Sequence, residues 1–178
     1  MSVFLPPMLN LFASSKSKHT IAPVSIKKRL SEVHRILLIY PIAIPQARVA
    51  RYTLARLTIL PNPFEIYVAV TDHILENVKI RAQQVLPIHQ STRHGEVTLD
   101  SIESWPVQNF DALVCLEPEP QDDLMALVWQ IQAPVTIGFS DGIGKHRFTV
   151  ELVKKHTEFL ENSYGSVLGL FGLKSVRK

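Results

Sequence analysis

Residues 35–70 read RILLIYPIAIPQARVARYTLARLTILPNPFEIYVAV and predict a strand, a loop, a helix and a second strand. The run RILLIY (35–40) is short, apolar and rich in branched residues, which is typical of a strand buried on both faces. PIAIP (41–45) interrupts this run, and FEIYVAV (64–70) repeats its character. Two such strands joined through a helix indicate parallel pairing in a sheet covered by helices.

The connecting segment, residues 46–60, has the apolar spacing of a helix. Ala50, Leu54 and Leu57 recur three or four residues apart, and arginines occupy positions around them. The prolines at 61 and 63 are expected to end the helix, because the residue before a proline disfavours the helical conformation.

The rest of the chain alternates in the same way. The expected fold class is therefore α/β: a three-layer, Rossmann-like parallel sheet of five strands in the order 3-2-1-4-5. The remaining strands are expected at 85–88, 110–116 and 134–138. Further helices are expected at 72–84, 98–105, 121–131, 150–163 and 165–173, with loops at 89–96 and 140–149.

The composition fits one soluble domain preceded by an arm. The chain has 178 residues, of which 46% are hydrophobic and 20% are charged. We expect residues 1–25 to form an extended N-terminal arm and residues 26–178 to form a single Rossmann-like domain. Neither the arm nor any other segment has the roughly 20 apolar residues that a membrane span requires. The single cysteine, Cys115, lies in the apolar run ALVCL and is expected to be a buried strand thiol in a reducing compartment.

The basic charge is concentrated near the N-terminus. Residues 1–35 hold six lysines and arginines against Glu32, a net +5 in a chain of net +3, so the remainder carries −2. The folded part is therefore not basic, and no aromatic-rich basic motif of the RNA-binding type is present. These features argue against nucleic acid as a partner.

The order of segments is similar to the opening of glycosyltransferase family 9, the heptosyltransferase-like enzymes. The residues that match that family's pattern in the first strand–helix–strand unit are Thr53, Leu54, Leu57, Pro61, Ile66 and Val68. Later segments that resemble it are FDALVCLEP (110–118), VTIGF (135–139) and the stretch 156–173, which includes His156. The resemblance spans roughly residues 34–174 and implies the acceptor-side, N-terminal half of that fold. The family's donor-binding domain would follow, and we expect this chain to lack it.

The resemblance also places the family's catalytic residues, and this sequence departs from them. The family's Gly-Asp pair falls on Pro45 and Gln46, and an amide cannot take a proton from an acceptor hydroxyl near neutral pH. Glu117 and Glu119 could substitute, but the stretch EPEP is expected to be a solvated acidic loop. The first glycine is Gly95, so a glycine-rich nucleotide loop after the first strand is excluded, and no cofactor is expected.

The remaining ligand candidates are basic and polar residues near the expected carboxyl ends of the strands. An anion could be held by the loop GIGKHR together with the first helix, and the candidates are Arg48, Arg51, Thr53, Lys145, His146 and Arg147. Alternatively, that loop is a solvated surface turn with no ligand. His89, His94 and Glu96 lack the spacing of a metal site, and no metal is expected. His73 is expected to start a helix, and Gly165 with Gly169 to allow close helix packing.

Partners are expected to be other protein chains, contacted through the C-terminal helix and the apolar residues of the arm: Val3, Phe4, Leu5, Met8, Leu9, Leu11 and Phe12. The apolar C-terminal stretch ending in Lys174, Arg177 and Lys178 also suits an anionic membrane surface. The function expected is a non-catalytic binding or assembly subunit in the cytoplasm, at the membrane face or away from it. Two alternatives stay open: a reduced glycosyltransferase acting with a donor-binding partner, and a peripheral envelope-membrane protein.

Overall fold

The computed structural model of the chain describes residues 25–58, 63–80, 82, 84–93, 96–100, 102–140, 148–152 and 159–173. The arm therefore lies outside the described residues, apart from residue 25. The strands are β1 (Arg35–Ile39), β2 (Glu65–Thr71), β3 (Gln84–Arg93), β4 (Glu96–Asp100), β5 (Ala112–Cys115), β6 (Val135–Phe139) and β7 (Val150–Leu152). The helices are α1 (Ile26–Ser31), α2 (Ile44–Thr53), α3 (Ala55–Thr58), α4 (Asp72–Val78), α5 (Asp122–Gln130) and α6 (Leu160–Leu170), with a 3-10 turn, η1, at Ile102–Ser104.

The strands form one sheet in the order β4-β3-β2-β1-β5-β6-β7. All neighbours are parallel except β3 and β4. Strand β1 lies at the centre, with Leu38 opposite Val68 of β2 and Val114 of β5. The predicted Rossmann-like fold is confirmed: the parallel strands, numbered among themselves, run 3-2-1-4-5-6. The sixth, β7, extends the predicted five-strand order by one.

Two polar segments differ from the sequence prediction. Residues 89–96 and 98–105 were expected to be a loop and a short helix, but β3 continues to Arg93 and pairs antiparallel with β4. Thr92, Val97 and Thr98 are branched residues that favour strands, and a paired edge satisfies their backbone groups. Within the segment expected as a helix at 150–163, residues 150–152 form β7 beside β6, and α6 begins at Leu160.

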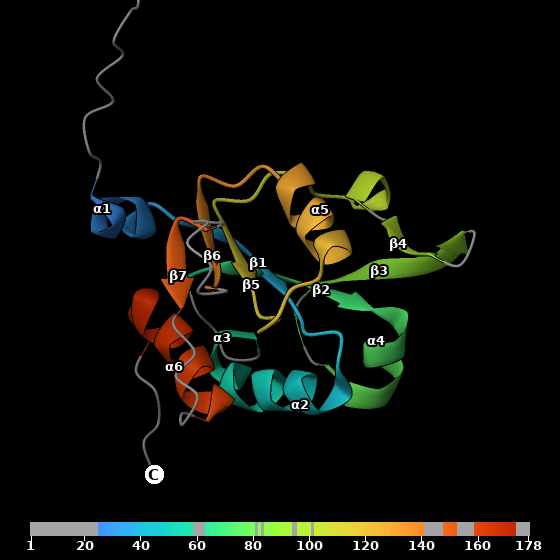
Figure 1. Ribbon diagram of the computed structural model, residues 1–178. Helices are drawn as coiled ribbons and strands as arrows, with labels where there is room; N and C mark the ends of the chain where they lie inside the picture. Colours follow the sequence, from blue (N-terminus) through green and yellow to red (C-terminus); the bar gives the residue numbers. More distant parts are fainter. Residues whose placement is uncertain are drawn as a thin grey trace, which may run out of the picture.

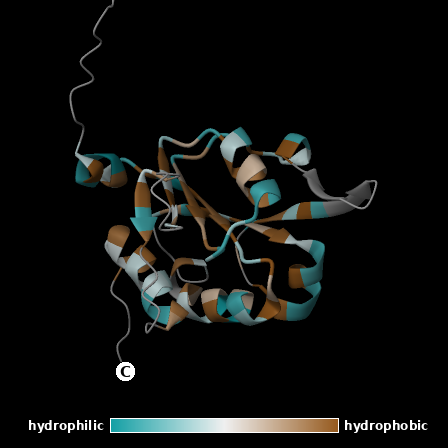
Figure 2. Cartoon of the chain, viewed as in Figure 1, coloured by the Kyte–Doolittle hydropathy of each residue, from teal (hydrophilic) through white to brown (hydrophobic). Residues whose placement is uncertain are grey.

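Helices cover the two faces of the sheet unequally, as Figure 1 shows. Alternate residues of β1 point to opposite sides, so Ile36, Leu38 and Tyr40 belong to one core and Leu37 and Ile39 to the other. Helices α2, α4 and α6 cover the first core, and α5 covers the second. Hydrophobic residues are concentrated between these layers (Figure 2).

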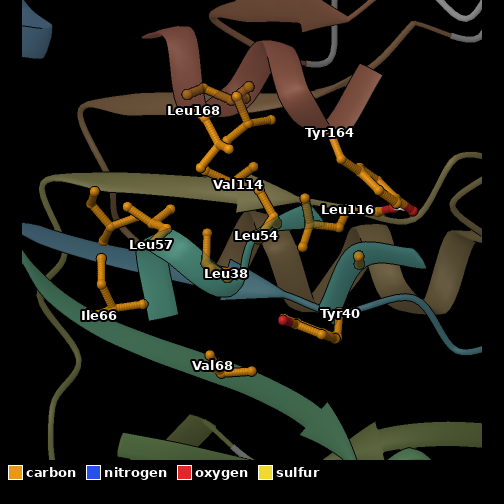
Figure 3. Close-up of a cluster of buried hydrophobic side chains, with 14 of the residues drawn as sticks. Leu38, Tyr40, Leu54, Leu57, Ile66, Val68, Val114, Leu116, Tyr164 and Leu168 are labelled. Atoms are coloured by element: carbon orange, nitrogen blue, oxygen red, sulfur yellow. Dashed lines mark hydrogen bonds between the residues drawn. The ribbon is translucent and has the colours of Figure 1, made fainter. Parts of the chain in front are cut away.

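The larger core depends on the predicted helix spacing. Ala50, Leu54 and Leu57 are fully buried, which confirms their expected role, although Leu54 interrupts the helix and separates α2 from α3. In Figure 3, Leu54 and Leu57 lie over Leu38 and Val114 from the sheet. Full burial of one leucine side chain contributes about 1.5–3 kcal/mol to folding.

Two glycines differ in the space around them. Gly138 of β6 is covered by the ring of Phe148, and a Cβ added there would overlap that ring. Gly169 of α6 is exposed, and a Cβ there would meet nothing within 4 Å. The expectation of close packing through the Gly165–Gly169 spacing is therefore wrong for Gly169, because this side of α6 faces solvent. In the described part of the chain, no helix has the length and apolar character needed to cross a membrane.

Candidate functional site

The carboxyl ends of the parallel strands define the candidate site. The chain leaves β1 for β2 on one side and later returns to β5 on the other, so the strand order reverses between β1 and β5. Open α/β sheets bind ligands outside the carboxyl ends of strands at such a reversal. The pairing continues one residue past the end of β5, because the Leu116 amide donates to the carbonyl of Ile39, the last residue of β1, at 2.9 Å. Residues 40–43 and 116–120 therefore meet at this edge.

Glu117 connects the two segments. Its Oε2 accepts a hydrogen bond from the Ile42 amide at 3.0 Å, and its Oε1 accepts a longer one from the Glu119 amide at 3.5 Å. The Glu117 residue is 7% exposed, whereas Glu119 is exposed. The expectation of a solvated EPEP loop is thus wrong for Glu117. The side chain reaches across to the loop after β1, where a backbone amide compensates its burial.

The start of α2 holds no carboxylate. Gln46 is the third residue of α2 and is half-buried, and the first turn of the helix has no acidic residue. Ala43 is the N-cap and makes no side-chain cap, and Pro45 has no amide hydrogen to donate. The position that the family resemblance assigns to a catalytic base therefore carries an amide side chain, and Pro45 beside it adds no backbone donor.

Two buried hydroxyl groups lie under this edge. The Tyr164 hydroxyl from α6 donates to the Leu116 carbonyl at 2.7 Å, as Figure 3 shows, and Tyr164 is fully buried. Burial raises the pKa of Tyr164, and the negative charge of Glu117 raises it further. Tyr40 is also buried, but its hydroxyl has no hydrogen-bond partner among the described residues. Burial raises the pKa of Tyr40 as well, against a smaller opposing effect of the Arg51 charge.

Cys115 is the last residue of β5 and is completely buried with a free thiol. Burial raises the pKa of this thiol to about 12. A thiol that stays protonated is a poor nucleophile, so the prediction of a structural strand cysteine is confirmed.

Three of the six basic and polar candidates lie in the part of the chain that the structure describes. Arg48 is exposed on α2, and Thr53 is the half-buried last residue of that helix. Arg51 donates from Nη1 to the Val78 carbonyl at 2.9 Å, where α4 ends. Its guanidinium thus satisfies a helix carbonyl, as basic groups do at helix C-termini. Lys145, His146 and Arg147 lie outside the described residues, so their proposed anion contact stays a prediction.

His89 contacts Asp72, a pairing that could not be predicted from the sequence. His89 Nδ1 lies 3.0 Å from Asp72 Oδ2, and both side chains are more than half exposed. The register that pairs Thr71 with Ile88 places Asp72 and His89 next to each other, and that register could not be inferred before β3 was aligned. His73 is the exposed second residue of α4, as expected, and its carbonyl accepts from Asn77 Nδ2 at 2.8 Å.

No metal site is evident among the described residues. They contain no group of three or more histidine, cysteine or acidic side chains able to hold a metal ion. Of the three residues weighed as metal ligands, His94 lies outside the described residues, and nothing is described of the Glu96 side chain. His89 is the one whose side chain is described, and it contacts Asp72 instead.

An open groove of about 600 Å³ lies at the other end of the sheet. Phe110, Trp129, Ile131 and Pro134 line it, next to the amino ends of β5 and β6. Trp129 is 65% exposed. The groove and the candidate site around Glu117 therefore lie at opposite ends of the strands. Ligands of such sheets usually bind at the carboxyl ends, where Glu117 lies.

The fold is similar to that of two solved glycosyltransferase structures. The glycosyl transferase family 9 protein from Veillonella parvula DSM 2008 matches over 79% of this chain and 42% of its own, with a TM-score of 0.54 and 16% identity. The E. coli heptosyltransferase WaaC, solved with ADP, matches over 81% of this chain and 49% of its own, with a TM-score of 0.58 and 12% identity.

The predicted resemblance is therefore confirmed at the level of the fold. This chain spans less than half the length of either protein, as expected for a partial copy of that fold. No family model matches the sequence, and no curated protein matches it.

Proposed function

We propose that this chain is a non-catalytic binding or assembly subunit built on a heptosyltransferase-like fold, acting within a larger protein complex. The observation that carries the proposal is the chemistry at the junction of β1 and α2. Gln46 stands at the family's base position, and the nearby carboxylate of Glu117 is buried against the Ile42 amide. The fold resembles about half of a glycosyltransferase, and the position that the family resemblance assigns to the base holds an amide.

Glycosyl transfer to a hydroxyl group requires a group that takes the hydroxyl proton. The amide of Gln46 has no useful proton affinity, and Glu117 is directed into the protein by its hydrogen bond to Ile42. Glu119 is an exposed carboxylate two residues from Glu117. Of the two glutamates in EPEP, it is therefore the better candidate for a substitute base.

Assays with several nucleotide-sugars test the catalytic part of the proposal. We expect the purified chain to show no transfer and no hydrolysis above background, because no base is aligned at the start of α2. Glu119→Gln should leave that background unchanged. Turnover by the wild-type chain that disappears in Glu119→Gln would overturn the proposal and identify Glu119 as the substitute base.

The proposed partners are other protein chains, bound through the N-terminal arm and the C-terminal helix. The arm carries apolar residues such as Phe4, Leu9 and Phe12 within a Pro-containing segment that cannot form a core of its own. Each such side chain contributes about 1.5–3 kcal/mol when fully buried, so a few anchors can offset the ordering of a short segment. Lys16 and Lys18 would add salt-dependent attraction to an acidic surface.

Substitutions in the arm test the partner role. We expect the full chain with Phe4, Leu9 and Phe12 all changed to serine to keep its melting temperature and to lose the proteins that co-purify with it from its native source. Asn10→Ser is the matched control, because it alters the same segment without removing an apolar group. Recovery of the same proteins at full yield with the triple variant would show that the arm is not the docking segment.

The fold similarity favours one alternative: a reduced glycosyltransferase that acts with a donor-binding partner. Unlike the non-catalytic role, this alternative requires a second protein that binds the sugar donor. It would gain support if the chain purified with its natural partners transferred sugar while the chain alone did not, and if Glu119→Gln abolished that transfer.

A further inference from the structure

The contacts of Glu117 resemble those of a bound anion. Two backbone N–H groups, from Ile42 and Glu119, point at the oxygens of one carboxylate. They come from the two segments that meet where the strand order reverses, which is where ligands bind in sheets of this kind. Backbone amides that converge on one point are the usual donors to phosphate in nucleotide-binding folds. Here a side chain of the same protein occupies that point.

We propose that the Glu117 carboxylate occupies an anion-binding site of this fold. Its presence there prevents phosphate-bearing ligands from binding at this edge of the sheet. The residue is 7% exposed, so its carboxylate occupies the position rather than resting on its surface. A second anion beside a buried carboxylate is disfavoured by repulsion between like charges. The role would distinguish this chain from nucleotide-binding proteins of similar fold, and it goes beyond the absence of catalysis proposed above.

Two described groups near Glu117 add no positive charge at this point. Tyr164 and Cys115 are neutral, because burial keeps both protonated near neutral pH. Arg51, which lies close enough to Tyr40 to affect its pKa, donates to the Val78 carbonyl on α4. The Ile42 amide donates its hydrogen bond to Glu117. Removing the carboxylate would leave a buried N–H group without its acceptor, and such a group favours any anion small enough to reach it.

Phosphate titration of the full-length chain tests the proposal. Glu117→Ala removes the carboxylate and should expose the Ile42 and Glu119 amides, so inorganic phosphate should bind at least tenfold more tightly than to the wild type. The readouts are the melting temperature at increasing phosphate against chloride of equal ionic strength, and the ¹⁵N–¹H resonance of Ile42. In the variant, both should move with phosphate; in the wild type, neither should.

Glu119→Ala is the matched control, because it removes an exposed carboxylate from the same loop and should behave like the wild type. Glu117→Ser replaces Glu117→Ala if the alanine variant does not fold, since its short side chain cannot reach the Ile42 amide in the same way. Equal phosphate binding by wild type and variant, or none by a folded Glu117 variant, would overturn the proposal. The titration involves no turnover, so its result is independent of the nucleotide-sugar assays.

Discussion

Above pH 9 the free energy of unfolding is expected to fall steeply, because three buried acidic protons resist ionisation in the folded protein. Cys115 has an ordinary pKa of 9.0 that burial raises to about 12. Tyr40 and Tyr164 have ordinary pKa values of 10.0, and burial raises both. The unfolded chain releases these protons first, so the folded state binds more protons in this range and loses stability as pH rises.

The size of the effect is large for a protein of this length. Each group contributes a slope of up to about 1.4 kcal/mol per pH unit once the pH exceeds its unfolded pKa. Between pH 8 and pH 11 the three groups together remove roughly 5 kcal/mol, which is comparable to the whole stability of many domains, about 5–15 kcal/mol. Urea unfolding at a series of pH values measures this loss directly, and below pH 8 these groups should have almost no effect.

Single variants separate the contributions to this alkaline loss. Tyr164→Phe and Cys115→Ala should each reduce the slope by the share of one group. Tyr52→Phe is the matched control, since Tyr52 is 79% exposed and the substitution removes a hydroxyl from the surface rather than from the core. A stability that stays flat between pH 8 and pH 11, or a slope that the Tyr52 variant changes as much as the Tyr164 variant, would contradict the explanation.

The central strands were predictable because they are buried on both faces. The run ILLI (36–39) has no polar residue at any position, and the spacing of Ala50, Leu54 and Leu57 indicates the buried side of the helix. The outer strands could not be predicted in the same way. Strands β3 and β4 extend through Gln90–Arg93 and Glu96–Asp100, where polar residues dominate and strand formation depends on a paired neighbour.

The environment of the candidate site was also hard to predict from the sequence. Gln46 and Glu117 can be read directly from the sequence, and the proposal of a missing base follows from the first of them. The burial of Glu117 does not follow, because EPEP has the composition of a solvated loop. Its environment depends on the Ile42 amide, 75 residues earlier in the chain, and contacts of that separation are visible only once the strands are paired. The Asp72–His89 contact has the same origin.

Tyr164→Phe and Tyr40→Phe are expected to have opposite consequences, although both remove one buried hydroxyl from the same core. The Tyr164 hydroxyl donates to the Leu116 carbonyl at 2.7 Å, so its loss leaves a buried acceptor without that donor. The cost should be about 1–3 kcal/mol. In a domain of this size that lowers the melting temperature by about 2–4 °C for each kcal/mol.

Tyr40→Phe provides the matched comparison, because the Tyr40 hydroxyl is buried without a hydrogen-bond partner. Its removal abolishes a desolvation cost and breaks no hydrogen bond, so stability should stay the same or rise by up to about 1 kcal/mol. The ring remains in both variants, and packing is therefore held constant. Thermal and urea unfolding at pH 7 measure both changes. If Tyr40→Phe is as destabilising as Tyr164→Phe, the Tyr40 hydroxyl has an acceptor after all, and a polar group or water under the candidate site must supply it.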